Sequence, residues 1–196
     1  ILPIFPERRE DGRWDGVYFP VAALPAAGRA RPLVLLICAV AHDVHGRGLL
    51  AADALAGEVV WRRHLDASPM YTRSAVADLG HDGRHEVIAL TQATDNLAGA
   101  RLHGVSDDSL RIHVLTDTGE ILWRRGLAGP GSGGDLTVAD VDGEPGPEVL
   151  AAWVDNATRA GHLAVWSGDG RRLWSRADAE KRSVQVAVAG GRDGEA

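Results

Sequence analysis

The chain has 196 residues and a formal net charge of −6, with 21 lysines and arginines against 27 aspartates and glutamates. This length is enough for a domain to bury an apolar core without disulfides, and the single cysteine, Cys38, cannot form an internal one. No basic stripe marks a nucleic-acid partner. The longest apolar run, residues 33–40, is far shorter than the roughly 20 residues of a membrane-spanning helix, so no membrane span is expected.

Short apolar and β-branched runs, separated by Gly, Pro and Asp, recur from one end of the chain to the other. No stretch keeps the apolar spacing of an amphipathic helix, so the sequence predicts an all-β fold. Thirteen strands are expected, at residues 19–24, 33–40, 48–53, 58–63, 72–77, 86–91, 110–116, 120–125, 135–140, 148–153, 162–167, 171–175 and 183–189.

Three of the expected hairpins repeat one pattern, in which a glycine turn precedes a tryptophan by four residues. The pairs are Gly57 with Trp61, Gly119 with Trp123, and Gly170 with Trp174. Successive tryptophans lie 62 and 51 residues apart, about the length of one four-stranded propeller blade. Their shared position predicts that they pack between blades rather than stack on a ligand.

The repeats predict about three β-propeller blades of four antiparallel strands, with partial blades at both ends. The expected divisions are 1–18, an arm or part of a preceding blade; 19–70, a degenerate blade; 71–131 and 132–180, blades with acidic loops; and 181–196, the start of a further blade. Known propellers close with at least about four blades. Further blades, from the same longer chain or from other chains, are therefore expected to complete the ring.

An acidic loop follows the first strand of the third repeat, at residues 140–148. Calcium prefers six or more oxygen ligands, which a tight loop can supply from alternate positions. Here Asp140, Asp142 and Glu144 stand at positions 1, 3 and 5, the Gly146 carbonyl at 7, and Glu148 at 9. This spacing predicts a structural calcium site.

The second repeat has a similar loop at residues 78–86. Asp78, Asp82 and Glu86 occupy positions 1, 5 and 9, and the Arg84 carbonyl occupies position 7. Position 3 is Gly80, so a water would have to replace that ligand. For both loops the alternative is a charged turn in which Asp caps backbone amides and no ion binds.

These loops resemble the D-x-D-x-D-G-x-x-[DE] calcium loop of FG-GAP/VCBS repeats, the blades of integrin-alpha-like propellers. The segments 117–123 (DTGEILW) and 168–174 (GDGRRLW) also look like the D-G-x-x-L-W turn of quinoprotein-like propellers, and the likeness covers about residues 19–196. The loop 140–148 departs from the pattern, since Pro145 replaces the usual glycine and Glu144 the usual aspartate.

The resemblance implies a secreted, extracellular or periplasmic scaffold, stabilised by calcium, that binds a protein or a glycan without catalysis. One alternative is the propeller portion of a polysaccharide lyase, in which Ca²⁺ acidifies a uronate and a basic residue takes its proton. A quinone-dependent dehydrogenase ranks last. No nucleophile elbow, zinc signature or dinucleotide fingerprint is present, so the sequence favours a protein that is not an enzyme.

The longest departure from the repeat, between Thr91 and Ser109, is the expected partner-binding region, because loops of this kind carry binding in repeat proteins. Trp166 is a further candidate for a surface aromatic, since its counterparts in the other repeats are Asp53 and Leu115. The partner-binding candidates are Asp95, Asn96, His103, Asp107, Asp108 and Trp166.

Overall fold

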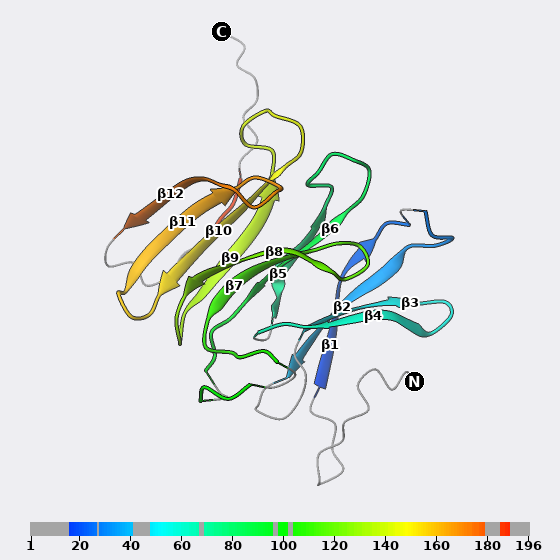
Figure 1. The fold of residues 1–196 in the computed structure, drawn as a ribbon, viewed down its shortest axis with the longest axis horizontal. Helices are drawn as coiled ribbons and strands as arrows, with labels where there is room; N and C mark the ends of the chain where they lie inside the picture. The colour runs from blue at the N-terminus through cyan, green and yellow to red at the C-terminus, as the bar shows by residue number, and fades with distance from the viewer. Residues whose placement is uncertain are drawn as a thin grey trace.

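The structure, a computed structural model, describes residues 16–26, 28–40, 48–66, 69–95, 98–101, 104–178 and 185–188. Within these ranges the chain forms twelve β-strands and no helix (Figure 1). The strands are β1 (Gly16–Leu24), β2 (Leu33–Val40), β3 (Gly48–Asp53), β4 (Glu58–His64), β5 (Pro69–Ala77), β6 (Glu86–Thr91), β7 (Leu110–Leu115), β8 (Ile121–Ala128), β9 (Gly133–Ala139), β10 (Glu148–Asp155), β11 (Ala160–Trp166) and β12 (Arg172–Asp178).

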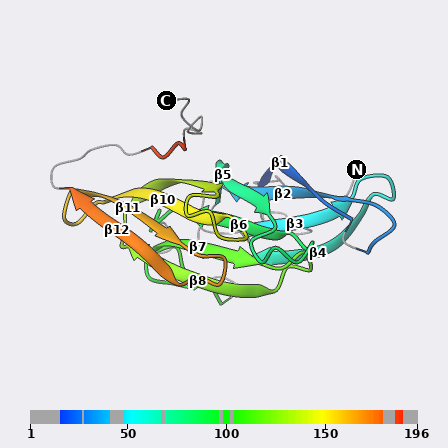
Figure 2. The ribbon, with the colours of Figure 1, turned by 90° about the horizontal axis from the view of Figure 1, so that it is seen from above.

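The strands form three four-stranded antiparallel sheets, β1–β4, β5–β8 and β9–β12, each in chain order. Figures 1 and 2 show the sheets one after another across the molecule, with the middle sheet between the other two. The three sheets do not close into a ring. The predicted all-β fold of four-stranded antiparallel sheets is confirmed. The open arrangement of the three sheets is consistent with partial blades at the ends. No described helix is long and apolar enough to cross a membrane.

Twelve of the thirteen expected strands are present, with limits close to those predicted. The exception is the strand expected at 183–189, of which the structure describes residues 185–188. These residues have no regular secondary structure, so the prediction is wrong there. No neighbouring strand pairs with them. The Val186 amide instead donates to Asp135 Oδ2 at 3.4 Å.

The middle sheet buries both of its faces, as its central strand β6 shows. Successive side chains of a strand point to opposite faces. Val87 and Ala89 belong to the apolar cluster shared with the first sheet, whereas Ile88 and Leu90 belong to the cluster shared with the third. All four are fully buried. Sheet-on-sheet burial on this scale is the main force that holds the three sheets together.

Two of the repeated tryptophans lie at the junctions between sheets. Trp61, on β4, donates from Nε1 to the Asp117 carbonyl of the second sheet at 2.9 Å. Trp123, on β8, makes the same bond to the Gly168 carbonyl of the third sheet at 2.8 Å. The prediction that the tryptophans pack between sheets therefore holds for these two. Trp174, on β12, is 47% exposed, because no described sheet follows that strand.

Candidate metal centre and neighbouring sites

The loop 140–148 joins β9 to β10, and the antiparallel register brings its two ends together. Ala139, the last residue of β9, pairs with Glu148, the first residue of β10. Asp140 and Glu148 therefore lie side by side at the base of the loop. Glycines with positive φ, Gly143 at 78° and Gly146 at 95°, let the chain reverse between them.

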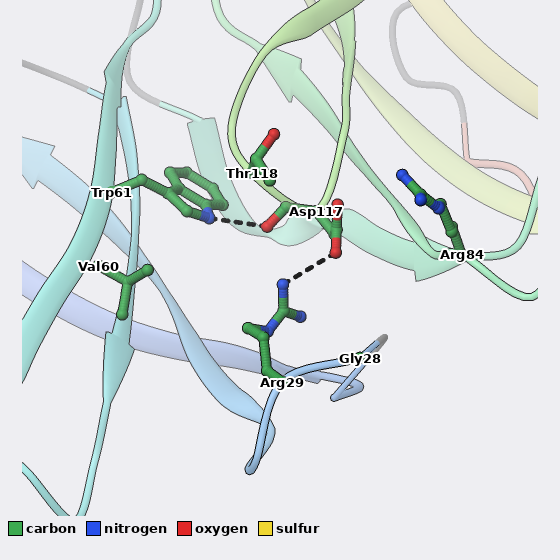
Figure 3. A pocket seen from close by; sticks show the side chains of 7 residues that line it. All are labelled: Gly28, Arg29, Val60, Trp61, Arg84, Asp117 and Thr118. Carbon is green, nitrogen blue, oxygen red and sulfur yellow. Dashed lines mark hydrogen bonds and ion pairs between the residues drawn. The ribbon is translucent and has the colours of Figure 1, made fainter.

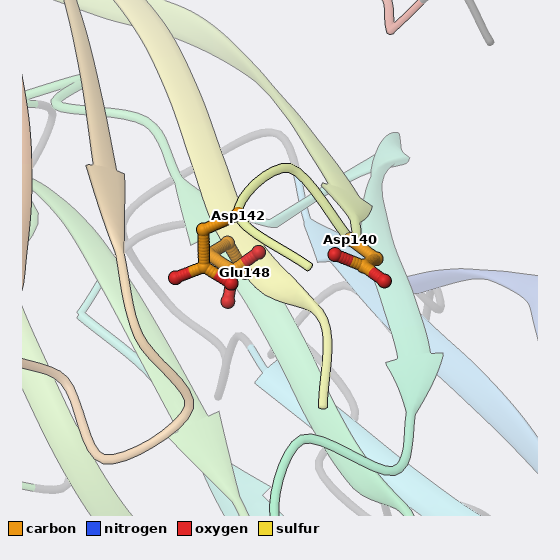
Figure 4. Close-up of side chains that lie close together, drawn as sticks. All are labelled: Asp140, Asp142 and Glu148. Atoms are coloured by element: carbon orange, nitrogen blue, oxygen red, sulfur yellow. The ribbon is translucent and has the colours of Figure 1, made fainter. Parts of the chain in front are cut away.

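Asp140, Asp142 and Glu148 bring one carboxylate oxygen each to within 4.8 Å of one another (Figure 4). Two oxygens that bind one Ca²⁺ at 2.3–2.6 Å can be at most about 5 Å apart, so the three oxygens fit a single calcium ion. Asp140 and Asp142 are exposed, whereas Glu148 is 3% exposed. This group can hold a metal ion, with Glu148 as its buried base.

One oxygen of each carboxylate accepts a hydrogen bond from a backbone amide of the same loop. Glu148 Oε2 accepts from Val141 N, and Asp142 Oδ1 accepts from Glu144 N, both at 2.9 Å. Asp140 Oδ1 accepts from Gly143 N at 2.9 Å. Because each carboxylate has two oxygens, these bonds fix the side chains and leave the second oxygen of each for another ligand.

Two further predicted ligands of this loop have different positions. The Glu144 carboxylate is exposed and is not one of the three gathered carboxylates. Gly146 packs against the other acidic loop, where a Cβ would lie 2.5 Å from the Leu79 carbonyl oxygen. The two acidic loops are therefore in contact. Whether the Gly146 carbonyl coordinates an ion stays a prediction.

The loop 78–86 has a similar frame but a different arrangement of carboxylates. Asp78 accepts from Asp82 N at 3.0 Å with Oδ1 and from Gly83 N at 2.8 Å with Oδ2, so both of its oxygens are engaged. Asp82 Oδ1 accepts from Arg84 N at 2.9 Å, and Glu86 Oε2 from Leu79 N at 2.9 Å. This loop contributes no group of three gathered ligands, although all its residues are described.

Two carboxyl groups in this loop have shifted pKa values. Burial raises the pKa of Glu86, and the charges of Asp82 and Asp78 raise it further. Burial would also raise the pKa of Asp78, but hydrogen bonds from the Gly83 and Asp82 amides lower it overall. Asp78 is therefore stabilised as a carboxylate by amides, and Glu86 is the strained charge of the loop.

A pocket of about 420 Å³ lies between the first two sheets and could not be found from the sequence repeats. It is lined by Gly28, Arg29, Val60, Trp61, Arg84, Asp117 and Thr118 (Figure 3). Arg29 Nη1 bonds Asp117 Oδ2 at 2.8 Å across the junction. Arg84, a predicted ligand through its carbonyl, turns out to line this pocket. The bond between Arg29 and Asp117 joins residues 88 positions apart, and no local sequence pattern marks it.

In the region expected to bind a partner, between Thr91 and Ser109, several side chains hydrogen-bond to one another. Asp107 is 1% exposed and accepts from Thr94 Oγ1 at 3.0 Å, so its side chain is not available to a partner. Asp108 accepts from the hydroxyls of Ser106 and Ser109 at 2.8 and 2.9 Å. Asp95 is exposed, with a φ of 53°. Asn96 and His103 lie outside the described residues.

Trp166 is not a surface aromatic, and this prediction is wrong. Its side chain is 3% exposed and its ring centroid lies 6.3 Å from that of Trp153, within the cluster between the second and third sheets. The counterpart Leu115 is fully buried as well. In the second and third sheets the repeat position is thus a core position, whereas Asp53 in the first sheet is only partly buried.

A buried charged group was also missed. Asp66 Oδ2 lies 3.1 Å from Arg111 Nη1 and 3.2 Å from His113 Nε2. Burial would raise the pKa of Asp66, but the hydrogen bond and charge of His113 and the Arg111 guanidinium lower it overall. Asp66 and His113 are 6% and 1% exposed. Such a group ties the segment after β4 to β7, a structural role.

Comparisons with known proteins do not assign a family. No protein-family model matches the chain, and no curated protein matches it. Among solved structures, it is similar to the crystal structure of the V. cholerae biofilm matrix protein Bap1, with 18% identity and a TM-score of 0.36. The match covers 90% of this chain and 30% of that one, so the chain spans less than a third of that protein's length. The likeness assigns no function to this chain.

Proposed function

We propose that this chain is a non-catalytic β-propeller scaffold of the FG-GAP/VCBS type, stabilised by calcium at the loop 140–148. The observation that carries the proposal is the gathering of Asp140, Asp142 and Glu148 around one point. Hard cations prefer such oxygen donors, and the loop's backbone fixes them in place. The blades are the segments 19–70, 71–131 and 132–180.

The role of the ion in this proposal is structural. Three carboxylates held this close repel one another, and a bound divalent cation replaces the repulsion with attraction. The loop joins two neighbouring strands and touches the loop 78–86 through Gly146. Calcium at this point would therefore hold both the β9–β10 corner and the contact between the second and third sheets.

The polysaccharide-lyase alternative requires a basic side chain that is free to take a proton beside the cation. Arg29, in the pocket, is paired with Asp117 at 2.8 Å. His113 is buried against Asp66. Neither is a free base, and none of the three gathered carboxylates lines the pocket. Arg29 and His113 therefore give the lyase alternative no support.

Location and partner follow from the same proposal. Sites with few carboxylates, two of them exposed, belong with the weak calcium sites of extracellular modules, which fill at about 10⁻⁴–10⁻³ M calcium. We place the chain outside the cytoplasm, in the extracellular space or the periplasm. Its partner is a protein or a glycan, bound at the rim that carries the exposed side chains of Asp95 and Asp108.

Calorimetric titration of the full chain with calcium tests the proposal. We expect one site, saturable, and a melting temperature that rises with calcium and falls with a chelator. Asp95→Asn is the matched control, because it removes one exposed acidic charge outside the cluster, at a position whose φ of 53° suits asparagine. A melting temperature that changes with neither calcium nor chelator would contradict the proposed structural role of calcium.

A further inference from the structure

The first junction between sheets is a two-point contact made by β4. Trp61 Nε1 donates to the Asp117 carbonyl at 2.9 Å, and Arg63 Nε donates to the Gly119 carbonyl at 2.7 Å. Both acceptors lie in the turn between β7 and β8 of the next sheet. The indole ring of Trp61 also packs against Gly119, where a Cβ would lie 2.7 Å from it.

The second junction repeats the contact with β8 and the turn between β11 and β12. Trp123 Nε1 donates to the Gly168 carbonyl at 2.8 Å, and Arg125 Nη2 to the Gly170 carbonyl at 2.7 Å. A Cβ on Gly170 would again lie 2.7 Å from the indole. Arg125 also lies over the Trp123 ring, 5.5 Å from its centroid, which adds a cation–π contact.

The two receiving turns share one conformation. Each spans five residues, 116–120 and 167–171, and begins with Thr116 or Ser167. In each, the first amide donates to the carbonyl of the fifth residue, at 2.8 and 3.0 Å, and the glycine amide donates to the first carbonyl, at 3.0 and 2.8 Å. The glycines have φ of 83° and 82°. The receiving element is therefore a Ser/Thr-x-x-Gly-x turn.

The third sheet carries the same donors on its outer strand. Trp174 and Arg176 lie on β12 with the spacing of Trp123 and Arg125, and Trp174 pairs with Val165 as Trp123 pairs with Val114. Trp174 is 47% exposed, against 8% for Trp123. The side chains of Trp174 and Arg176 make no hydrogen bond or ion pair with a described residue. The contact surface is present, and no described residue supplies a receiving turn for it.

A second copy of the described residues cannot supply that turn. The turns 116–120 and 167–171 are already covered by Trp61 and Trp123. The outer turn of the first sheet has another form, in which Gly57 N donates to the Asp53 carbonyl at 2.8 Å and Asp53 Oδ1 accepts from Leu55 N and Ala56 N, both at 2.9 Å. It therefore lacks the conformation that the first two junctions require.

We propose that Trp174 and Arg176 form a docking surface for a further four-stranded sheet whose outer hairpin has a Ser/Thr-x-x-Gly-x turn. The glycine carbonyl of that turn accepts from Arg176, and the carbonyl two residues earlier accepts from Trp174, as at both existing junctions. The ring of Trp174 then covers the glycine. This docking needs no metal ion, so it stands apart from the proposed calcium role.

The test adds the missing sheet to the full chain, by placing a second copy of residues 129–178 after Asp178. Iodide quenching then reports the exposure of Trp174, measured as the difference between each chain and its Trp174→Phe variant. We expect quenching of Trp174 to fall several-fold, to the level of a buried indole. A matched control changes the added copy of Gly170 to Val, and we expect exposure to return, because the side chain meets the indole.

A second probe covers the case in which the added sheet does not fold. A backbone-cyclised peptide of residues 110–122, which contains the turn 116–120 and no tryptophan, is titrated into the unextended chain. We expect protection of Trp174, lost with Arg176→Ala and with valine in place of the peptide's Gly119. Unchanged quenching with both the folded extended chain and the peptide would overturn the proposal. So would self-association of the unextended chain that Trp174→Ala abolishes, because the occupant would then be a second copy.

Discussion

The two acidic loops, 78–86 and 140–148, occupy the same position in their sheets but arrange their carboxylates differently. Both follow the first strand of a sheet and end at a glutamate that begins the second strand. Glu86 and Glu148 each accept from the amide of the loop's second residue, at 2.9 Å in both loops. Only in the loop 140–148, among the described residues, do three acidic side chains gather within reach of one ion.

The difference can be traced to the third loop position. In the loop 140–148 that position is Asp142, whose carboxylate joins those of Asp140 and Glu148. In the loop 78–86 it is Gly80, and Asp78 instead caps two amides with its two oxygens. Two loops of the same length and the same end residues can thus be a cation site or a self-capped turn, depending on whether amides or a cation satisfy the first aspartate.

Removing one carboxylate from each loop gives the largest expected contrast. Asp142→Asn should abolish the calcium response of the melting temperature, because asparagine keeps the bond to Glu144 N but loses the charge. At calcium a hundredfold above the dissociation constant the loss is about 2.7 kcal/mol. For a chain of this length that corresponds to roughly 5–10 °C, measured by differential scanning calorimetry.

Asp82→Asn is the matched variant in the other loop, since its oxygen can still accept from Arg84 N. We expect it to leave the calcium response unchanged. Equal losses in the two variants would mean that both loops bind calcium, and the contrast between them would be wrong.

The contact between the loops gives the next effect. Gly146→Ala places a Cβ 2.5 Å from the Leu79 carbonyl oxygen, at a φ of 95°. We expect a destabilisation of about 2 kcal/mol in urea unfolding, with or without calcium. Gly143→Ala is the control, because Gly143 also has a positive φ, 78°, but a Cβ there meets nothing within 4 Å. Equal destabilisation by the two variants would show that backbone strain, rather than contact between loops, is the cause.

Gly80→Asp should convert the self-capped loop towards a cation site. Gly80 does not have a positive φ, and a Cβ there would meet only Asp82 Cγ, at an ordinary 3.8 Å. The added carboxylate therefore fits. We expect a second calcium site in calorimetric titration, and a further calcium-dependent stabilisation of about 1.4 kcal/mol at calcium tenfold above its dissociation constant. If the Gly80→Asp chain still bound one calcium ion, the third loop position would not be the cause of the difference between the two loops.

The fold was largely predictable because its signals are local and repeated. Alternating apolar runs bounded by glycine and aspartate define the strands, and the tryptophans at 61 and 123 mark the sheet junctions. The sequence could not reveal that Trp174 is uncovered, because its exposure depends on a neighbouring sheet rather than on its own repeat. Trp166 was misjudged for a related reason: a residue that breaks the repeat can still fill a core position.

The candidate site was only partly predictable. The spacing of Asp140, Asp142 and Glu148 identified the carboxylates that gather, since their arrangement depends on one short loop. Charged contacts between sheets left no such mark in the sequence. The pair of Arg29 with Asp117 and the pair of Asp66 with His113 join residues far apart in the chain, and their partners become evident only when the sheets are stacked.

The smallest expected effect is a pH dependence in the self-capped loop. Burial and the neighbouring carboxylates raise the pKa of Glu86. A group with a raised folded-state pKa contributes stability that is fully present below its unfolded pKa and is lost as the pH rises through the folded pKa. Glu86→Gln removes this loss while keeping an oxygen for Leu79 N. In urea unfolding with chelator present, the variant should therefore gain stability relative to the natural chain as the pH rises from about 4 towards neutrality. The exposed Glu58→Gln serves as control. A difference between Glu86→Gln and the natural chain that stays constant with pH would mean that amide capping, and not a strained charge, governs this loop.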